Sequence, residues 1–243
     1  MNISTPPLIS IITVSYNAED TIEQTILSVI NQNFEDYEYI IVDGGSTDGT
    51  VDIIKKYQEK IAYWVSEPDN GIYDAMNKGV KIAIGDLIAL LNSDDWYEDG
   101  TLTTVANCFY LNPHVDVFHG LLRFIDENTH ETNMIRGVSS VNLEQMMIEH
   151  PTCFIKREVY DMVGSFNLKY KSAADYDWML SAKYKGSKFL LIPEVLTNFR
   201  LGGMSSSFTS LKEDLKIKKK FGIYKISKYM YKYVLLYLAF LRK

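Results

Sequence analysis

Two adjacent carboxylates, Asp94 and Asp95, directly follow an apolar run in the stretch LIALLNSDDW. Such a run is typical of a strand that is buried on both faces, so the acidic pair is expected at the mouth of that strand. Carboxylates in this position repel each other and lose hydration, and a bound divalent cation offsets both costs. The pattern therefore indicates a cation site that would also neutralise a diphosphate. A cap for the next helix is the ordinary alternative.

A second polar stretch, DGGSTDGT, begins at Asp43. Taken alone it is typical of a turn followed by a helix N-cap, because Gly, Ser, Thr and Asp are common in both. It matches neither the G-x-G-x-x-G fingerprint nor a P-loop. A carboxylate at the end of a strand also repels phosphate. Asp43 is therefore better suited to accept a hydrogen bond from a base N–H or a ribose hydroxyl.

Short apolar segments alternate with amphipathic ones through the first half of the chain. Strands are predicted at 8–14, 37–43, 61–67 and 86–91, with helices between them at 21–32, 50–60 and 71–85. This alternation predicts βαβ units and an α/β fold with a mainly parallel, Rossmann-like sheet and flanking helices. Ligands of such sheets bind at the carboxyl ends of the strands. The polar stretches SYNAED, DGGSTDGT, EPDNG and NSDD all fall at those ends.

The second half of the chain is less regular. Two strands, at 116–126 and 188–200, are expected to add an antiparallel part, on the side of the sheet where an acceptor, the second substrate of a transfer reaction, would bind. Helices are predicted at 143–150, 157–166 and 175–186. No internal repeat and no low-complexity linker interrupts the chain. We therefore predict one domain over 1–211, with a nucleotide-binding half at about 1–95 and an acceptor-binding half at 96–211.

The segment 212–243 differs from the rest in charge. It holds ten Lys or Arg and two acidic residues, whereas the whole chain has a net charge of −6. The acidic body argues against nucleic acid as a partner. Lys, Tyr and aliphatic residues together favour an amphipathic helical tail on an anionic inner membrane surface. A helix packed on the protein's own core, or across a homodimer, is the alternative.

The expected location is the cytoplasm, on the inner face of the cell membrane. The N-terminus lacks the basic and apolar regions of a signal peptide, and no segment reaches the roughly 18 apolar residues of a membrane span. The two cysteines, Cys108 and Cys153, have neither metal-ligand spacing nor a disulfide framework around them, which fits a reducing compartment.

Five segments taken together resemble glycosyltransferase family 2, whose members are inverting nucleotide-sugar transferases with the GT-A fold. They are SIITVSYNAEDTIEQTILSVINQ, YIIVDGGSTDGT, EPDNGIYDAMNKGVKIAIGDLIALLNSDDW, AADYDWMLSAKYKG and FRLGGMSS, in order from about residue 8 to 207. The resemblance implies a GT-A fold and transfer of a hexose or N-acetylhexosamine from a UDP-sugar. It also implies a saccharide acceptor, lipid-diphosphate-linked if the enzyme serves bacterial surface-polysaccharide assembly.

The resemblance also implies roles for single residues. NSD takes the place of the family's D-x-D motif, with Asp94 as the ligand of Mn²⁺ or Mg²⁺ and Asn92 where the first Asp usually stands. Asp175 in ADYD takes the place of the catalytic base, with Asp177 as the second choice. The nucleotide-sugar contacts implied are Val14 and Tyr16 beside the base, Asp43 on the uracil ring, and Asp69, Gly71, Asn77, Lys78, Ser93 and Asp95 around the donor.

Three further residues are candidates because of their chemistry. The guanidinium of Arg200 suits a diphosphate, and the glycines that follow it would let a loop close over the donor. A salt bridge to the acidic body is the alternative. His150 and Trp178 are candidate acceptor contacts, although a lone His is usually a surface or capping residue and a Trp beside such motifs usually packs in the core.

The mechanism predicted from these roles is a single in-line displacement. Asp175 accepts the proton of an acceptor hydroxyl, which attacks the anomeric carbon opposite the nucleotide, and the configuration inverts. Two alternatives stay open. Paired carboxylates also make glycosidases, which need neither nucleotide nor metal, and the missing charge at Asn92 is compatible with an inactive sugar-nucleotide-binding module. The choice between UDP and dTDP also stays open, because thymine presents the same imide edge as uracil.

Overall fold

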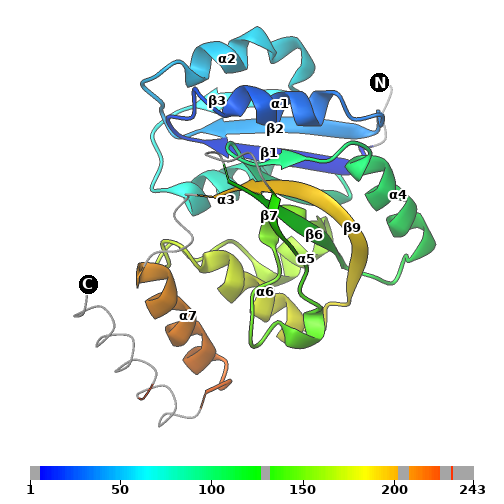
Figure 1. The fold of residues 1–243 in the computed structure, drawn as a ribbon, viewed down its shortest axis with the longest axis vertical. Coiled ribbons are helices and arrows are strands. Elements are labelled where there is room, and N and C mark those ends of the chain that lie inside the picture. Colours follow the sequence, from blue (N-terminus) through cyan, green and yellow to red (C-terminus); the bar gives the residue numbers. More distant parts are fainter. Residues whose placement is uncertain (1–5, 127–131, 202–207, 225–230, 232–243) are drawn as a thin grey trace.

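One nine-stranded sheet organises the chain (Figure 1). The computed structural model describes residues 6–126, 132–201, 208–224 and 231. The strands are β1 (Ile9–Ser15), β2 (Tyr37–Asp43), β3 (Tyr63–Ser66), β4 (Leu87–Asn92), β5 (Trp96–Tyr97), β6 (Val117–Ile125), β7 (Thr132–Arg136), β8 (Phe154–Lys156) and β9 (Phe189–Arg200). Their order is β3-β2-β1-β4-β8-β6-β9-β5, and β7 pairs with β6.

Helices cover both faces of this sheet. They are α1 (Ile22–Ile30), α2 (Thr50–Lys56), α3 (Ile72–Ile82), α4 (Thr101–Leu111), α5 (Arg157–Val163), α6 (Ala174–Tyr184) and α7 (Phe208–Lys220). Helices α1, α2 and α4 pack on one face through a cluster that includes Ile26, Ile54 and Leu102. Helices α3, α5 and α6 pack on the other face through a cluster that includes Met76 and Met179. Figure 1 shows this three-layer arrangement, as the βαβ pattern predicts.

The first four strands are parallel, as the alternation of elements predicts. β1 lies between β2 and β4, and β3 extends the sheet beyond β2. The register pairs Ser15 with Asp43 and Asp43 with Ser66, while Asn92 pairs with Val14. The polar residues that follow these strands are therefore brought to one edge of the sheet.

The second half adds the expected antiparallel part to the sheet. β8 is antiparallel to both β4 and β6, β7 is antiparallel to β6, and β5 is antiparallel to β9. The strands predicted at 116–126 and 188–200 are β6 and β9, which take part in these antiparallel pairs and are parallel to each other. β8 has only three residues, too few to give a periodic signal in the sequence.

The helix predicted at 143–150 is wrong. The chain there makes turns between two short 3-10 helices, Ser140–Asn142 and His150–Thr152. Leu143 and Ile148 are fully buried at 0% exposure, so their apolar character serves burial through turns and not a helical face. Pro151 begins the second turn, because its fixed φ and missing N–H favour a break at that position.

The tail begins as a helix packed on the body. In Figure 1, α7 lies beside α6, and it crosses the boundary predicted between residues 211 and 212. Leu215 and Ile217 are buried at its inner side, and Lys220 makes a 2.6 Å ion pair with Asp177 of α6. The described part of the tail thus follows the alternative of packing on the protein's own core. The rest, 225–230 and 232–243, lies outside the described residues, as does the segment 202–207, on which the expected closing loop falls.

None of the helices in the described ranges combines the length and the apolar character required to cross a membrane.

Candidate active site at the carboxyl ends of the strands

The carboxylate of Asp43 at the end of β2 is buried and holds its own loop. Its oxygens accept hydrogen bonds from the Oγ atoms of Ser15, Ser46 and Ser66 and from the backbone N–H groups of Gly45 and Ser46. The side chain is 0% exposed. Burial acts to raise the pKa of Asp43, but the hydrogen bonds together outweigh it, so that this pKa is lowered from its usual value. Asp43 thus organises the turn.

Asp43→Asn is expected to destabilise the fold by about 2–3 kcal/mol, because an amide NH₂ would face donors that now bond to a charged acceptor. The measurement is urea unfolding at neutral pH. Asp52→Asn is the matched control, since the Asp52 side chain is 85% exposed and pairs only at the surface with Lys55. Equal stability of Asp43→Asn and Asp52→Asn would contradict the role of Asp43 in holding the turn.

The stability that Asp43 adds to the fold also depends on pH. Because the pKa of Asp43 is lowered in the folded state, this stabilisation is present above about pH 4 and is lost as the pH falls through the folded pKa.

The acidic stretch after β4 has negative charge and buried acceptor atoms that the described residues around it satisfy only in part. Asp95 is 0% exposed, and one of its oxygens accepts a long bond, 3.3 Å from the backbone N of Arg200. Among the residues that the structure describes, its other oxygen and Oδ1 of Asn92 have no hydrogen-bond partner. Burial, followed by the charge of neighbouring Asp94, raises the pKa of Asp95 well above its usual value. Ser93 is also buried, at 9% exposure.

Arg200, at the end of β9, is brought to this acidic stretch. Its Nε donates to the backbone oxygen of Asp94 at 3.2 Å, and its guanidinium lies 5.1 Å from the centre of the Trp96 ring. A further nitrogen donates to Gln24 on α1 at 2.7 Å. The pairing of β5 with β9 explains this position, because it sets the end of β9 beside the residues that follow β4. The loop after Arg200 lies outside the described residues.

The oxygen atoms at the end of β4 fit a divalent cation. The two buried oxygens on Asn92 and Asp95, which have no hydrogen-bond partner within the described ranges, are of the kind that Mg²⁺ and Mn²⁺ prefer as ligands. Asp94 lies between these two residues in the chain. Among the described residues no group of three or more His, Cys, Asp or Glu is arranged to hold a metal. The protein therefore supplies few ligands here, and a cation would need oxygens from a bound diphosphate to complete its shell.

Asp175 lies in the first turn of α6 and is oriented by α3. Tyr73 Oη donates a 2.9 Å hydrogen bond to Asp175 Oδ1. Burial and the nearby carboxylate raise the pKa of Tyr73, so the phenol stays protonated and acts as the donor. The ring of His150 is 8% exposed; burial lowers its pKa, against the opposing charge of Asp175. Tyr73 was missed at the sequence level because its partner lies 102 residues away.

Three of the predicted contact residues have packing or hydrogen-bond partners within the protein. Val14, near the end of β1, is 4% exposed, and Trp178, at 3%, donates from Nε1 to the backbone oxygen of Gly164 and packs against aromatic rings. Both polar atoms of the Asn77 amide bond to the backbone of Phe166, at 2.8 and 3.0 Å. Trp178 and Asn77 thus have packing and loop-fixing roles, whereas Val14 lies at the strand ends, paired with Asn92.

The remaining donor-side residues surround the start of α3. Tyr16 exposes 65% of its surface just beyond β1. Asp69 accepts a 2.7 Å bond from the backbone N of Gly71, whose φ of 108° is favourable only for glycine at this helix start. Lys78 pairs with Glu67 at 2.8 Å and lies partly exposed. Tyr16, Asp69 and Gly71 therefore border the strand ends, with Lys78 about two turns further along α3.

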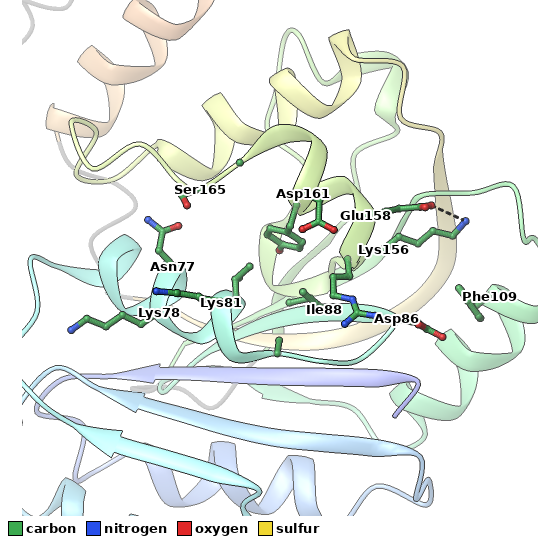
Figure 2. A pocket seen from close by; sticks show the side chains of 15 residues that line it. Asn77, Lys78, Lys81, Asp86, Ile88, Phe109, Lys156, Glu158, Asp161 and Ser165 are labelled. Atoms are coloured by element: carbon green, nitrogen blue, oxygen red, sulfur yellow. Dashed lines mark ion pairs between the residues drawn. The ribbon is translucent and has the colours of Figure 1, made fainter. Parts of the chain in front are cut away.

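A groove of about 990 Å³ lies elsewhere, between α3 and α5 (Figure 2). It is lined by charged side chains of both signs, including Lys81, Asp86 and Asp161. Asn77 and Lys78 reach it, but its lining includes none of the residues at the ends of β1, β2 and β4, and not Asp175. The candidate active site is thus the strand-end surface and not this groove.

The chain is similar in sequence to known glycosyltransferases. Residues 10–175 match Glycosyl transferase family 2. A PGL/p-HBAD biosynthesis glycosyltransferase of Mycobacterium tuberculosis is 31% identical over 180 residues, which cover 71% of this chain and 68% of that protein.

Two solved structures have similar folds. TarS of S. aureus gives a TM-score of 0.68 at 22% identity over 86% of this chain, which spans only 38% of TarS. Its 1–349 fragment, at 20% identity, was solved in complex with UDP-GlcNAc. The mannosyltransferase PcManGT of Pyrobaculum calidifontis, in complex with GDP-Man and Mn²⁺, gives 0.68 at 17% identity and covers 91% of this chain, with 66% of PcManGT covered in return.

Proposed function

This chain belongs to glycosyl transferase family 2 and is a glycosyltransferase, and from that premise we propose the reaction that it catalyses. It moves a hexose or N-acetylhexosamine from a UDP-sugar to a saccharide acceptor, with inversion and with the help of a divalent cation. The observation that carries the proposal is a pair of buried oxygens, on Asn92 and Asp95, that have no hydrogen-bond partner in the described part of the chain. They flank Asp94 on the sheet edge that also presents the exposed ring of Tyr16.

The donor end of the reaction depends on charge compensation. Asp94, with the free oxygens of Asn92 and Asp95, would hold Mn²⁺ or Mg²⁺, which when bound supplies positive charge to the leaving diphosphate. Arg200 lies against the backbone of Asp94 and adds a second positive charge. The solved complexes of the TarS fragment with UDP-GlcNAc and of PcManGT with GDP-Man and Mn²⁺ support a nucleotide-sugar donor and a cation.

The acceptor end depends on Asp175. The Tyr73 hydroxyl fixes one carboxylate oxygen, which leaves the other to take the proton of an acceptor hydroxyl as its oxygen attacks the anomeric carbon. Attack from the face opposite the diphosphate inverts the configuration, and no covalent intermediate forms. His150, beside Asp175, is a candidate contact for the acceptor saccharide.

Two measurements test this function. Calorimetric titration with UDP, with and without Mn²⁺, examines the donor site. NMR of the product from an α-linked UDP-sugar examines the chemistry, and a β-glycoside is expected. Binding of UDP without turnover on any saccharide acceptor would favour an inactive binding module, and a product that retains its configuration would rule out single displacement.

A lipid-diphosphate-linked acceptor at the inner membrane surface is the finer part of the proposal. Its support is the charge of the last 19 residues, which contain five Lys or Arg and no acidic residue. A chain ending at Tyr224 keeps all of α7, and it also keeps Phe221, just after this helix, whose ring stacks on Tyr184 at 5.2 Å. This truncation therefore removes the basic end and leaves the described packing intact.

The truncated chain is expected to bind anionic vesicles at least about tenfold more weakly than the full chain, because each lost cation near the surface removes about 1 kcal/mol. The measurement is co-sedimentation with phosphatidylglycerol-containing vesicles, and vesicles of neutral phosphatidylcholine are the control. Equal co-sedimentation of the two chains would remove the membrane part of the proposal and leave the transfer reaction untouched.

A further inference from the structure

The helix α7 is tied to the loop that leads into α6. The carboxylate of Glu213 on α7 accepts hydrogen bonds from the backbone N–H of Lys171, at 2.8 and 3.0 Å, and from that of Ser172, at 2.9 Å. Glu213 is 6% exposed, so these bonds are largely shielded from water, and hydrogen bonds to a carboxylate are among the strong ones. One side chain thus fixes two consecutive residues that lie 41 and 42 positions earlier in the chain.

The loop that Glu213 holds comes directly before the proposed catalytic base. Ser172 is followed by Ala173, the N-cap of α6, and Asp175 is the second residue of that helix. Because the N-cap is an alanine, its side chain makes no capping hydrogen bond that would fix the start of the helix. The backbone before α6 is instead held from outside, by Glu213. The place of Asp175 therefore depends on α7 through this loop and on α3 through Tyr73.

Two lysines of α7 contact the same region. Lys218, at 6% exposure, donates from Nζ to the backbone oxygen of Gln145 at 3.0 Å, and its Nζ lies 5.4 Å from the centre of the Tyr176 ring. Lys220 pairs with Asp177 at 2.6 Å. Figure 1 shows α7 beside α6, as these contacts require. The lysines hold α6 and the turns before it in place, whereas the carboxylate of α7 holds the backbone immediately before the base.

We propose that Glu213 is a positioning residue for the transfer reaction, because by holding the loop before α6 it sets the position of the Asp175 carboxylate. This inference rests on the proposed function, since Asp175 is the base of that reaction. A general base has to lie within hydrogen-bond reach of the hydroxyl that it deprotonates, and a misplacement of about 1 Å can lower the rate by about 100-fold. The segment predicted as a membrane tail thus begins with a residue that serves catalysis.

Glu213→Gln removes the hold on the loop with almost no change in size. One acceptor oxygen becomes an NH₂ donor, so a single oxygen remains for the N–H groups of Lys171 and Ser172. Asp214→Asn is the matched control, because it removes the same charge from the next residue of α7. The Asp214 carboxylate pairs within the helix with Lys218 at 2.9 Å, and an amide oxygen can still accept from that lysine. Thermal melting of the full chains checks that both variants fold.

A double-mutant cycle with Asp175→Asn separates positioning from general stability. The readout is kcat for release of UDP, with a saccharide acceptor, from the UDP-hexose or UDP-N-acetylhexosamine that the wild type turns over fastest. Glu213→Gln is expected to lower kcat by about 10- to 100-fold in the wild-type background. In the Asp175→Asn background it is expected to lower kcat by less than about twofold, because a residue that acts through the base has no effect once the base is gone.

The Kd for UDP with Mn²⁺ is expected to stay unchanged in Glu213→Gln, and Asp214→Asn should keep the kcat of the wild type. An unchanged kcat in Glu213→Gln, or an equal loss in both backgrounds, would overturn the inference and leave the proposed reaction standing. If Glu213→Gln does not fold, Glu213→Asp takes its place in the same cycle, since its carboxylate is one methylene group too short to hold both N–H groups. If Asp175→Asn keeps the kcat of the wild type, the proposed function fails instead.

Discussion

Asp175→Asn is expected to lower kcat by about 10²- to 10⁴-fold, the usual contribution of a general base, and to leave the Kd for UDP nearly unchanged. Asn keeps the shape of the side chain and can still accept the bond from Tyr73 Oη, so the first turn of α6 is retained. It cannot take a proton. The loss should therefore fall on kcat and not on the binding of the donor, which lies at the strand ends.

Asp177→Asn is the control for that experiment. Asp177 is on the same helix two residues later, but its carboxylate is 8% exposed and pairs with Lys220 of α7 at 2.6 Å. Its neutralisation removes the same charge from the same turn of α6 and leaves Asp175 in place. A larger fall of kcat in Asp177→Asn than in Asp175→Asn would exchange the two assignments, and unchanged kcat in both would require a base from elsewhere in the fold.

Asp94→Ala is expected to abolish the part of UDP binding that depends on Mn²⁺ and to lower kcat/KM by about 10²- to 10³-fold, as removal of one charge-stabilising group does. Without Asp94, the protein oxygens of the predicted cation site would come from Asn92 and Asp95, and only Asp95 of these two has a carboxylate. Calorimetric titration with UDP over a series of Mn²⁺ concentrations measures directly how much of the affinity for UDP depends on the metal.

Asp99→Ala is the matched control, because Asp99 is an exposed carboxylate five residues further along the chain. It should bind UDP and Mn²⁺ as the wild type does. If Asp94→Ala keeps the Mn²⁺ dependence of the wild type, the cation is held by other groups. If neither variant nor the wild type shows any Mn²⁺ dependence, the reaction proceeds without a cation and relies on Arg200 for the charge of the diphosphate.

The first half of the fold is predictable because its signals are local. Each of the strands β1, β2 and β4 is a run of apolar residues with a clear polar end, and every helix between them has an amphipathic pattern. The helix α4 was not predicted, since its sequence TLTTVANCFYL is rich in Thr and contains Val, Asn, Cys, Phe and Tyr, which all have low helix propensity. The false helix at 143–150 has the opposite cause: its apolar spacing resembles a helical face, but tertiary burial decides its backbone.

The candidate site is less predictable because its important contacts are not local. Nothing near Tyr73 in the sequence indicates that it bonds to Asp175. Likewise, the position of Asp69 beside Gly44 depends on the loop before α3 crossing the end of β2, which neither motif contains. Trp178 is the opposite case, a residue that the sequence offers as a ligand contact because it follows ADYD. In the structure its indole is held in the core. Motifs identify the residue types, and packing decides which of them face the ligand.

The long connection between β4 and β9 has a consequence for synthesis of the protein. Asp95 receives its backbone hydrogen bond from Arg200, 105 residues later in the chain. Asp94 and Asp95 therefore leave the ribosome long before the arginine and the strand that lie against them. A nascent chain that ends before β9 has the acidic pair but neither the positive charge nor the neighbouring strand. The proposed donor site is thus assembled late in translation, whatever the stability of the early βαβ units.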